Sequence, residues 1–330
     1  MDDFSPSDLK SILHSKRANI YYLEYCRVMQ KDGRVLYLTE SSRENLYFNI
    51  PIANTTVILL GNGTSITQAA IRMLAQAGVL VGFSGGGGTP LFMANDVEQP
   101  IEWFTPQSEY RPTEYLQGWM SFWFDDKKRL SAAKMLQTAR IKYLSRVWQK
   151  DKDLKQNGFD LNGIESALDA FNLRTDQAQK QSEILLTEAQ LTKALYKFSA
   201  NATNTEGFKR QHASTDLAND FLNHGNYLAY GLAASCLWVL GIPHGFAVMH
   251  GKTRRGALVF DVADLIKDAL VLPWAFICAK ENATEQEFRQ QILQAFTDHK
   301  TLDYMFDNIK EISLTNVNDS DINNEKSPSL

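Results

Sequence analysis

The stretch EYRPTEYLQGWMSFW, residues 109–123, marks a change in the pattern of apolar side chains. Tyr115, Trp119, Phe122 and Trp123 recur at a spacing of three or four residues, which predicts a helix. Few strand or hairpin signals follow, so we expect the rest of the chain to be mostly helical. Helices are predicted at about 113–149, 184–198, 217–240, 262–278 and 284–309.

The region before this stretch has the composition of short strands, rich in Tyr, Val, Leu and Phe. The first three predicted strands suggest a meander, because Lys31-Asp32-Gly33 supplies turn residues between the first two. Ser65 is expected to cap a helix over 66–77, which Gly78 would end. Strands are predicted at 20–28, 34–38, 46–50, 54–60, 79–83 and 90–93.

These patterns together predict an α+β protein with two domains. We expect a β-rich, β-sandwich-like N-terminal domain over 1–100 and a larger all-α C-terminal domain over 101–314, with the boundary around Gln99-Pro100. Residues 315–330 hold Asn, Asp, Ser and Pro and almost nothing to bury. We therefore expect a disordered tail there.

The composition limits the class of protein. With 330 residues, 44% hydrophobic and 22% charged, the chain suits one large or two ordinary domains with sizeable cores. A formal charge of −4 means that any nucleic-acid surface must be local. Three cysteines without a C-x-x-C pair argue for a reducing compartment and against structural zinc. With no signal-like start and no apolar run approaching ~18 residues, we expect a cytoplasmic protein that does not enter the membrane.

Basic residues gather between Lys127 and Lys155, where ten lysines and arginines stand against two aspartates. Two interpretations remain open for this segment. It is either a solvated helix face or a surface that follows the phosphates of DNA. On the second interpretation, we expect Arg140, Lys142 and Arg146 to contact DNA.

Two glycine-rich segments invite a nucleotide-binding interpretation. Gly61-Asn62-Gly63 follows an apolar strand, but Ile66 replaces the third glycine of a G-x-G-x-x-G loop, and no G-K-[ST] motif is present. A turn followed by a helix cap is the favoured interpretation of this segment. The run of four glycines at 85–88 is likewise interpreted as a flexible loop.

Glu188 lies on an apolar stripe of its predicted helix, beside Ile184, Leu191 and Leu195. No Lys or Arg stands one turn away from it. A carboxylate turned toward a core must find a partner, take up a proton or bind a cation, because an unpaired buried charge is costly. An ion pair with a distant Arg and a cation site therefore both remain open.

Three aspartates, Asp261, Asp264 and Asp268, share one face of the helix predicted at 262–278. Like charges at this spacing repel one another. The arrangement is tolerated when solvent screens the charges or when a divalent cation lies among them. Because the helix is predicted to begin near Asp261, that residue could alternatively be a cap.

His250 follows a largely apolar stretch and precedes Arg254 and Arg255. A lone histidine in such surroundings is more often a hydrogen-bonded structural residue than a ligand, and His244 is a competing candidate. The combination with an inward Glu and an acidic helix face favours a metal site, because two carboxylates and one imidazole suit Mg²⁺ or Mn²⁺. The chain has no H-E-x-x-H motif, which disfavours a zinc protease.

Four segments carry a resemblance to a known family. They are VILLGNGTSIT (57–67), Glu188-Ala189, His250 and LVFDVAD (258–264). In this order they resemble the CRISPR-associated adaptation endonuclease and integrase, the first-numbered Cas protein, and their spacing is closest to its type I-F branch. The similarity spans about residues 18–310. It departs from the family's proline-x-x-glycine-x-x-histidine pattern, since Pro243 lies seven residues before His250 and Ala247 takes the glycine position.

The resemblance implies a helical domain that holds one divalent metal, Mg²⁺ or Mn²⁺. By position, Glu188, His250 and Asp264 match the family's metal ligands, and Asp261 matches a supporting acid of the catalytic site. The resemblance also implies a homodimer, which we expect to form through the N-terminal domain, and DNA as a partner. A second adaptation Cas protein, fused in this branch to the helicase-nuclease, is the remaining implied partner.

The function implied is a metal-dependent endonuclease and integrase that inserts foreign DNA fragments into the CRISPR array by phosphodiester transesterification. Lys252, Arg254 and Arg255 are then expected to clamp phosphates near the metal. Two alternatives stay open. One is a non-catalytic DNA-binding scaffold, and the other is a nucleotide-binding enzyme that uses the Gly61–Ser65 loop.

Overall fold

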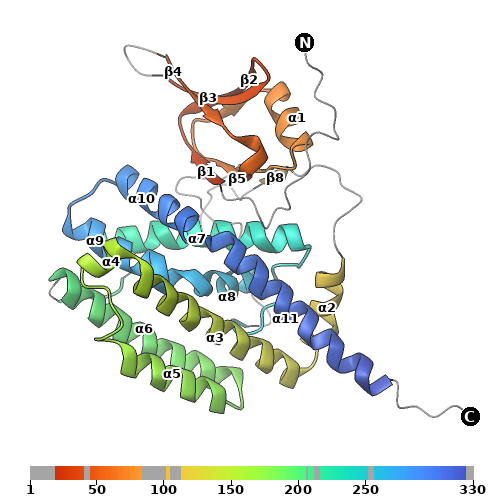
Figure 1. Cartoon of the computed structure of the whole chain (residues 1–330), viewed down its shortest axis with the longest axis vertical. Helices are drawn as coiled ribbons and strands as arrows, with labels where there is room; N and C mark the ends of the chain where they lie inside the picture. Colours follow the sequence, from red (N-terminus) through yellow and green to blue (C-terminus); the bar gives the residue numbers. More distant parts are fainter. Residues whose placement is uncertain are drawn as a thin grey trace, which may run out of the picture. The chain divides into compact units, whose positions relative to one another are not determined.

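The computed structural model divides the chain into two compact units, Met1–Tyr110 and Arg111–Leu330. It describes residues 19–40, 45–83, 102–104, 113–205, 207–211, 216–251 and 256–324. The expected boundary near residue 100 lies outside these ranges. The first unit is rich in strands and the second is mostly helical (Figure 1), which confirms the predicted α+β class.

The described residues of the first unit form two four-stranded sheets, with strand orders β1-β5-β7-β8 and β4-β3-β2-β6. Val28 and Val35 from one sheet share a buried core with Ile58 and Val81 from the other and with Leu74 of the helix α1. The expected sandwich-like arrangement is therefore present. The elements are β1 (Asn19–Leu23), β2 (Cys26–Lys31), β3 (Arg34–Glu40), β4 (Asn45–Ile50), β5 (Thr55–Leu60), β6 (Ser65–Ile66), α1 (Gln68–Gln76), β7 (Leu80–Phe83) and β8 (Glu102–Phe104).

Strands β2, β3 and β4 form the predicted antiparallel meander, but the first predicted strand is broken. Tyr25, with a φ of 48°, separates β1 from β2, and β1 pairs in parallel with β5 instead. The backbone N–H of Tyr25 donates to Asn62 (2.9 Å), and that of Gly61 donates to Leu23 (2.8 Å). A side chain on Gly63 would collide with the Tyr25 ring. The Gly61–Gly63 segment is thus the favoured turn.

The helix α1 begins later than predicted. Ser65 and Ile66 pair with β2 as the short strand β6, so Ser65 is not the cap. Thr67 is the cap, because its side chain accepts a hydrogen bond from the backbone N–H of Ala70 at 3.3 Å. The glycine run at 85–88 and the strand predicted at 90–93 lie outside the described residues.

The second unit is a bundle of helices in which α7 packs against α8, α9, η4, α10 and α11. α7 is buried along most of its length and matches its predicted bounds. A helix that is apolar on nearly all sides is typical of a position inside a core. Its elements are α2 (Glu114–Trp123), α3 (Asp126–Lys150), α4 (Lys152–Gln156), α5 (Glu165–Gln177), α6 (Gln181–Thr203), α7 (Leu217–Leu240), α8 (Ala257–Ile266), η4 (Lys267–Val271), α9 (Leu272–Lys280), α10 (Glu285–Asp298) and α11 (Thr301–Asn324).

Two long predicted helices are interrupted. The helix predicted over 113–149 divides at Asp125, whose carboxylate accepts the backbone N–H groups of Lys127 and Lys128 and so starts α3 afresh. The helix predicted over 262–278 begins at Ala257 and contains the π-helical segment η4. Such segments inside α-helices often lie at functional sites.

The end of the chain differs from the predicted tail. The helix α11 continues to Asn324, past the expected start of disorder at residue 315, because a helix that is already packed can extend by local backbone hydrogen bonds alone. Residues 325–330 lie outside the described part. Among the described helices, none is both long enough and apolar enough to cross a membrane.

Candidate metal centre

Glu188 lies on α6 with its side chain 15% exposed. Its Oε1 accepts a hydrogen bond from Nη1 of Arg140, on α3, at 2.8 Å. Nε of the same guanidinium donates to Oδ2 of Asp268, in η4, at 2.6 Å. One oxygen of Glu188 is therefore held by Arg140, and the other, Oε2, faces His250 at 3.9 Å from Nε2.

Asp264 is buried on α8, 3% exposed, and its Oδ1 lies against the ammonium of Lys267. Apart from this ion pair, Oδ1 of Asp264 has no hydrogen-bond donor among the described residues, so the oxygen keeps acceptor capacity. Burying a carboxylate is costly without compensating charge. Lys267 supplies part of that charge, and the stem of its side chain places its Nζ 5.2 Å from the centre of the Tyr230 ring.

His250 lies in an irregular loop between α7 and α8, where Asp261 fixes it. Oδ1 of Asp261 lies 2.6 Å from Nδ1 of His250, and the same oxygen accepts the backbone N–H of His250 at 3.1 Å. Oδ2 of Asp261 accepts the backbone N–H groups of Val248 (2.8 Å) and Met249 (3.1 Å). A carboxylate bound to one ring nitrogen orients the other nitrogen for a metal. Nε2 is the nitrogen left for this role.

The three predicted ligands meet. One ligand atom from each of Glu188, His250 and Asp264 lies within 4.8 Å of the others. Two partly satisfied carboxylates and an oriented imidazole form a donor set that fits a hard or borderline dication such as Mg²⁺ or Mn²⁺. The residues present therefore fit a single divalent ion.

The pKa shifts in this cluster follow from burial and neighbouring charge. Burial and the negative charge of Asp264 raise the pKa of Glu188, although Arg140 and His250 oppose the shift. Burial also opposes the ionised form of Asp264, but Lys267 and Arg140 outweigh it and lower the pKa of Asp264. At His250, burial is outweighed by the hydrogen bond to Asp261 and by the nearby carboxylates, so its pKa is raised. The cluster thus attracts positive charge.

The three aspartates of the acidic face are not screened by solvent, because all three are buried. Asp261 is not a helix cap either, since α8 begins four residues earlier and Asp261 binds the His250 loop. Asp268 pairs with Arg140 and does not belong to the ligand cluster. The face combines one candidate ligand, one residue that orients His250 and one that binds Arg140.

The prediction that Arg140 contacts DNA is corrected by the structure. Arg140 is 2% exposed, and its guanidinium binds Glu188 and Asp268, so it has no access to a duplex. Arg140 lies on the buried side of α3, together with Leu136 and Leu144. A count of basic residues along the sequence does not distinguish this side from the exposed one. Lys142 and Arg146 do lie on the exposed side of α3.

The remaining predicted residues divide into two groups. Lys252, Arg254 and Arg255 lie outside the described residues. His244, the competing histidine, lies away from the cluster, and its backbone oxygen accepts the N–H of Leu258 at 2.9 Å. Burial lowers the pKa of His244. His244 is therefore a half-buried histidine outside the ligand cluster.

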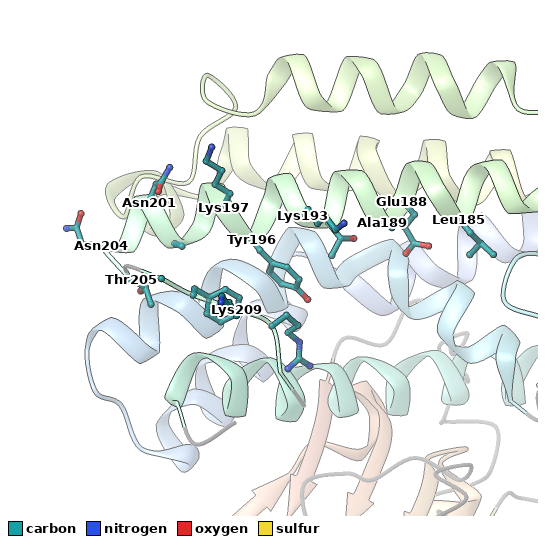
Figure 2. Close-up of a pocket in the computed structure, with 15 residues that line it drawn as sticks. Leu185, Glu188, Ala189, Lys193, Tyr196, Lys197, Asn201, Asn204, Thr205 and Lys209 are labelled. Atoms are coloured by element: carbon teal, nitrogen blue, oxygen red, sulfur yellow. The ribbon is translucent and has the colours of Figure 1, made fainter. Parts of the chain in front are cut away.

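Sequence reasoning missed two features of the site. The first is Lys267, whose spacing of three residues from Asp264 on a helix was the available signal. The second is a groove of about 980 Å³ beside α6. Figure 2 shows Glu188 toward one end of this groove and Asn204 toward the other, with Lys193, Tyr196 and Lys197 between them on α6. Its residues come partly from the segment after α6, which no local pattern links to Glu188.

A family model described as CRISPR associated protein Cas1 matches residues 20–306. The chain belongs to the Cas1 family. A CRISPR-associated endonuclease Cas1 of Pectobacterium atrosepticum is 56% identical over 314 residues, which cover 94% of this chain and 96% of the relative. A CRISPR-associated endonuclease Cas1 of Pseudomonas aeruginosa is also 56% identical, over 95% of this chain and 98% of the relative. The family resemblance found in the sequence is thus confirmed.

Solved Cas1 structures share the fold at lower identity. TtCas1 in complex with DNA is 20% identical, with a TM-score of 0.60 over 90% of this chain and 92% of that one. A chain of a partial Cas6-RT-Cas1–Cas2 complex is 12% identical, with a TM-score of 0.58 over 92% and 96%. At sequence identities this low, the structural similarity establishes the fold alone, and it covers both units of the chain.

Proposed function

We propose that this Cas1 is a metal-dependent DNA endonuclease and integrase of CRISPR adaptation. The observation that carries the proposal is the convergence of Glu188, His250 and Asp264 from α6, a loop and α8. Its membership of a family whose 56% identical members are endonucleases supports the same activity. The three buried free cysteines suit a reducing, cytoplasmic compartment.

Glu188, His250 and Asp264 would hold a single Mg²⁺ or Mn²⁺. When bound, such an ion supplies a positive charge that polarises a phosphate oxygen and offsets the charge gained in the transition state. Asp261 binds Nδ1 of His250, which leaves Nε2 facing the cluster. Arg140 binds Oε1 of Glu188, which leaves Oε2 of Glu188 facing the cluster as well. The protein's part is to keep these donors in place before DNA arrives.

The proposed reaction is a transesterification. The 3′-hydroxyl of a DNA fragment attacks a phosphorus at the end of a repeat, and a new P–O bond forms to that 3′-oxygen. The bond from the phosphorus to the 3′-oxygen of the array strand breaks, and the departing oxygen gains the proton that the attacking hydroxyl loses. With water as the nucleophile, the same site cuts DNA, and the reverse transfer resolves a branched DNA.

The groove beside α6 supports DNA as the substrate. Lys193 and Lys197 lie one turn apart on its wall, and the aromatic ring of Tyr196 lies between them in sequence. Cationic side chains alternating with an aromatic surface suit a single strand, because phosphates and base faces both find partners. A strand in this groove would lead to Glu188. Lys142 and Arg146 on the exposed side of α3 are proposed to contact the duplex farther out.

A homodimer is proposed through the first unit. The strand β4 lies at the edge of its sheet, and Leu46, Tyr47 and Phe48 on it are 46%, 48% and 43% exposed. An apolar edge strand of this kind favours pairing with another chain. A second adaptation protein, in this branch fused to the helicase-nuclease, is a further proposed partner, supported by the solved complex that contains Cas1 and Cas2.

The test is cleavage and strand transfer on a branched DNA in Mn²⁺. Glu188→Gln keeps the side-chain volume but removes the charge. We expect loss of both activities in a protein that still unfolds cooperatively, with a lower thermal midpoint because the buried Arg140 loses one of its two carboxylate partners. Glu183→Gln, on the same helix, is the matched control, since the side chain of Glu183 accepts a hydrogen bond only from the backbone N–H of Gln179 among the described residues. Full activity of Glu188→Gln would remove this residue from the site.

The two alternatives are separable from this proposal. A non-catalytic DNA-binding scaffold would bind DNA with wild-type affinity and show no Mn²⁺-dependent cleavage. A nucleotide-binding enzyme would be stabilised by ATP or NAD through the Gly61–Ser65 loop. The packing of Gly63 against Tyr25 favours a structural turn at that loop.

A further inference from the structure

The loop that carries His250, residues 242–250, has no regular secondary structure, yet it has to place a metal ligand. Irregular backbone lacks the repeating hydrogen bonds that hold a helix or strand, so its peptide groups need other partners. A ligand on a loose loop costs affinity because the loop must be ordered on binding. The hydrogen-bond partners of this loop therefore affect how firmly His250 is held at the metal centre.

Two tryptophans on α2 supply such partners. Nε1 of Trp119 donates to the backbone oxygen of Phe246 at 2.9 Å, and Nε1 of Trp123 donates to that of Ala247 at 2.7 Å. Because the two indoles lie four residues apart, they project from the same face of α2, one turn apart. Two successive turns of the helix thus bind two successive carbonyls of the loop.

The residues bound by the two indoles are followed directly in the chain by the residues bound by Asp261. The carbonyls of residues 246 and 247 are held by Trp119 and Trp123, and the N–H groups of residues 248, 249 and 250 are held by Asp261. Five consecutive residues, ending at His250, each have a backbone group bound by a side chain from another element. Fixing the carbonyl side and the N–H side together defines the path of this segment.

The helix that carries the indoles is itself anchored. Trp119 is fully buried, and the ring of Trp123 packs edge-on against that of Phe246 with centroids 4.9 Å apart. The backbone oxygen of Trp123 accepts Nη1 of the buried Arg129 at 3.0 Å. α2 also packs against α11. The indole N–H groups are thus presented from a fixed support.

We propose that Trp119 and Trp123 are positioning residues for the metal centre, whose N–H groups fix the backbone before His250 so that Nε2 faces Glu188 and Asp264. Neither tryptophan touches the ligand cluster, and both act through the loop. The link to the metal rests on the proposed function, but the fixing of the loop does not. The inference explains how the chain orients His250 although Ala247 replaces the glycine of the family pattern.

The test replaces each indole by a ring without the N–H group. In the full chain, Trp119→Phe/Trp123→Phe removes both bonds to the loop. Trp274→Phe is the matched control, because Trp274 is also buried but its Nε1 has no hydrogen-bond partner among the described residues. The single variant Trp123→Phe serves if the double variant fails to fold, since Trp123 is only half-buried.

Three readouts other than activity decide the proposal. Hydrogen exchange of the metal-free protein reports on the amides of residues 248–250, which we expect to exchange about tenfold faster in the double variant and at the wild-type rate in the control. Titration with Mn²⁺ alone should show a Kd raised roughly tenfold, at the lower end of the effect of partners outside the ligand shell. Spin-echo spectra of bound Mn²⁺ should show a weaker nitrogen coupling from His250.

The outcomes separate this inference from the proposed function. Unchanged hydrogen exchange at residues 248–250 in the double variant would overturn the role proposed for the indoles. An unchanged Kd for Mn²⁺ in that variant, or the same changes in exchange and Kd in Trp274→Phe, would overturn it as well. Failure of the wild-type protein to bind Mn²⁺ would overturn the proposed metal site and, with it, the metal part of this inference. The exchange result would still decide whether the indoles fix the loop.

Discussion

Asp261 binds His250 twice, through Nδ1 of the imidazole at 2.6 Å and through the backbone N–H at 3.1 Å. Its second oxygen accepts the N–H groups of the two preceding residues. A carboxylate with four such donors has its lone pairs engaged and is poorly placed to bind a metal itself. Its role is to fix the orientation of His250, and Glu188 and Asp264 are left as the carboxylate ligands.

This relationship predicts the effect of Asp261→Asn. The amide keeps the shape of the side chain but loses the charge, and its NH₂ group cannot accept the N–H groups that one carboxylate oxygen accepts. We expect the affinity for Mn²⁺ to fall roughly 10- to 100-fold, the usual effect of removing a partner of a metal-binding histidine. Isothermal titration with Mn²⁺ measures this. Wild-type affinity in Asp261→Asn would contradict the assigned role.

The same substitution should change stability strongly at Arg140 and hardly at all at Lys142, two residues farther along α3. Arg140→Gln leaves the carboxylates of Glu188 and Asp268 buried without their partner, which costs about 3–5 kcal/mol of unfolding free energy. Lys142→Gln changes an exposed residue, and we expect a change within about 0.5 kcal/mol. Urea denaturation compares the two. A similar small loss in both variants would mean that Arg140 is not buried among these acids.

The exposed side of α3 makes a separate prediction for DNA binding. Lys142→Gln/Arg146→Gln should reduce the slope of log K against log salt by about two, because each phosphate contact contributes about one. Lys280→Gln/Lys300→Gln removes the same charge from exposed positions on another part of the unit. That control should leave the slope nearly unchanged. Equal slopes in both variants would make the α3 side an ordinary solvated face.

His244 gives a pH dependence of stability. Burial lowers the pKa of His244 below its usual 6.5, so the folded protein binds this proton less readily than the unfolded chain does. The stability that comes from the neutral histidine is present above about pH 6.5 and is lost as the pH falls through the folded-state value. We expect His244→Gln to lose less stability than wild type between pH 7.5 and 5.5. Denaturant titrations at the two pH values measure this, and parallel losses would contradict it.

Much of the site followed from local sequence patterns. The apolar stripe around Glu188 indicated an inward carboxylate, and both interpretations left open for it are present together, an ion pair with a distant Arg and a place among the candidate ligands. The bounds of α7 also matched, because a long apolar helix with an Asp cap and a Gly end is a strong local signal. The assignment of Glu188, His250 and Asp264 as the three metal ligands, by contrast, came from the family resemblance.

The remaining features depend on contacts that sequence spacing does not encode. The burial of Arg140 depends on the arrival of α6 and η4 against α3, residues 48 and 128 positions away along the chain. The bonds from Trp119 and Trp123 to the His250 loop span 127 and 124 positions. The spacing of Trp119 and Trp123 predicted a helix, but periodicity carries no information about which carbonyl an indole N–H will reach.

A crystal structure of this chain with Mn²⁺, in which anomalous scattering locates the ion, measures whether the three residues share one metal. We predict one manganese peak per chain, at coordination distance from Oε2 of Glu188, Nε2 of His250 and a carboxylate oxygen of Asp264, with Nδ1 of His250 still bound to Asp261. A manganese peak bound to fewer than these three residues, or no peak among them at saturating Mn²⁺, would contradict it.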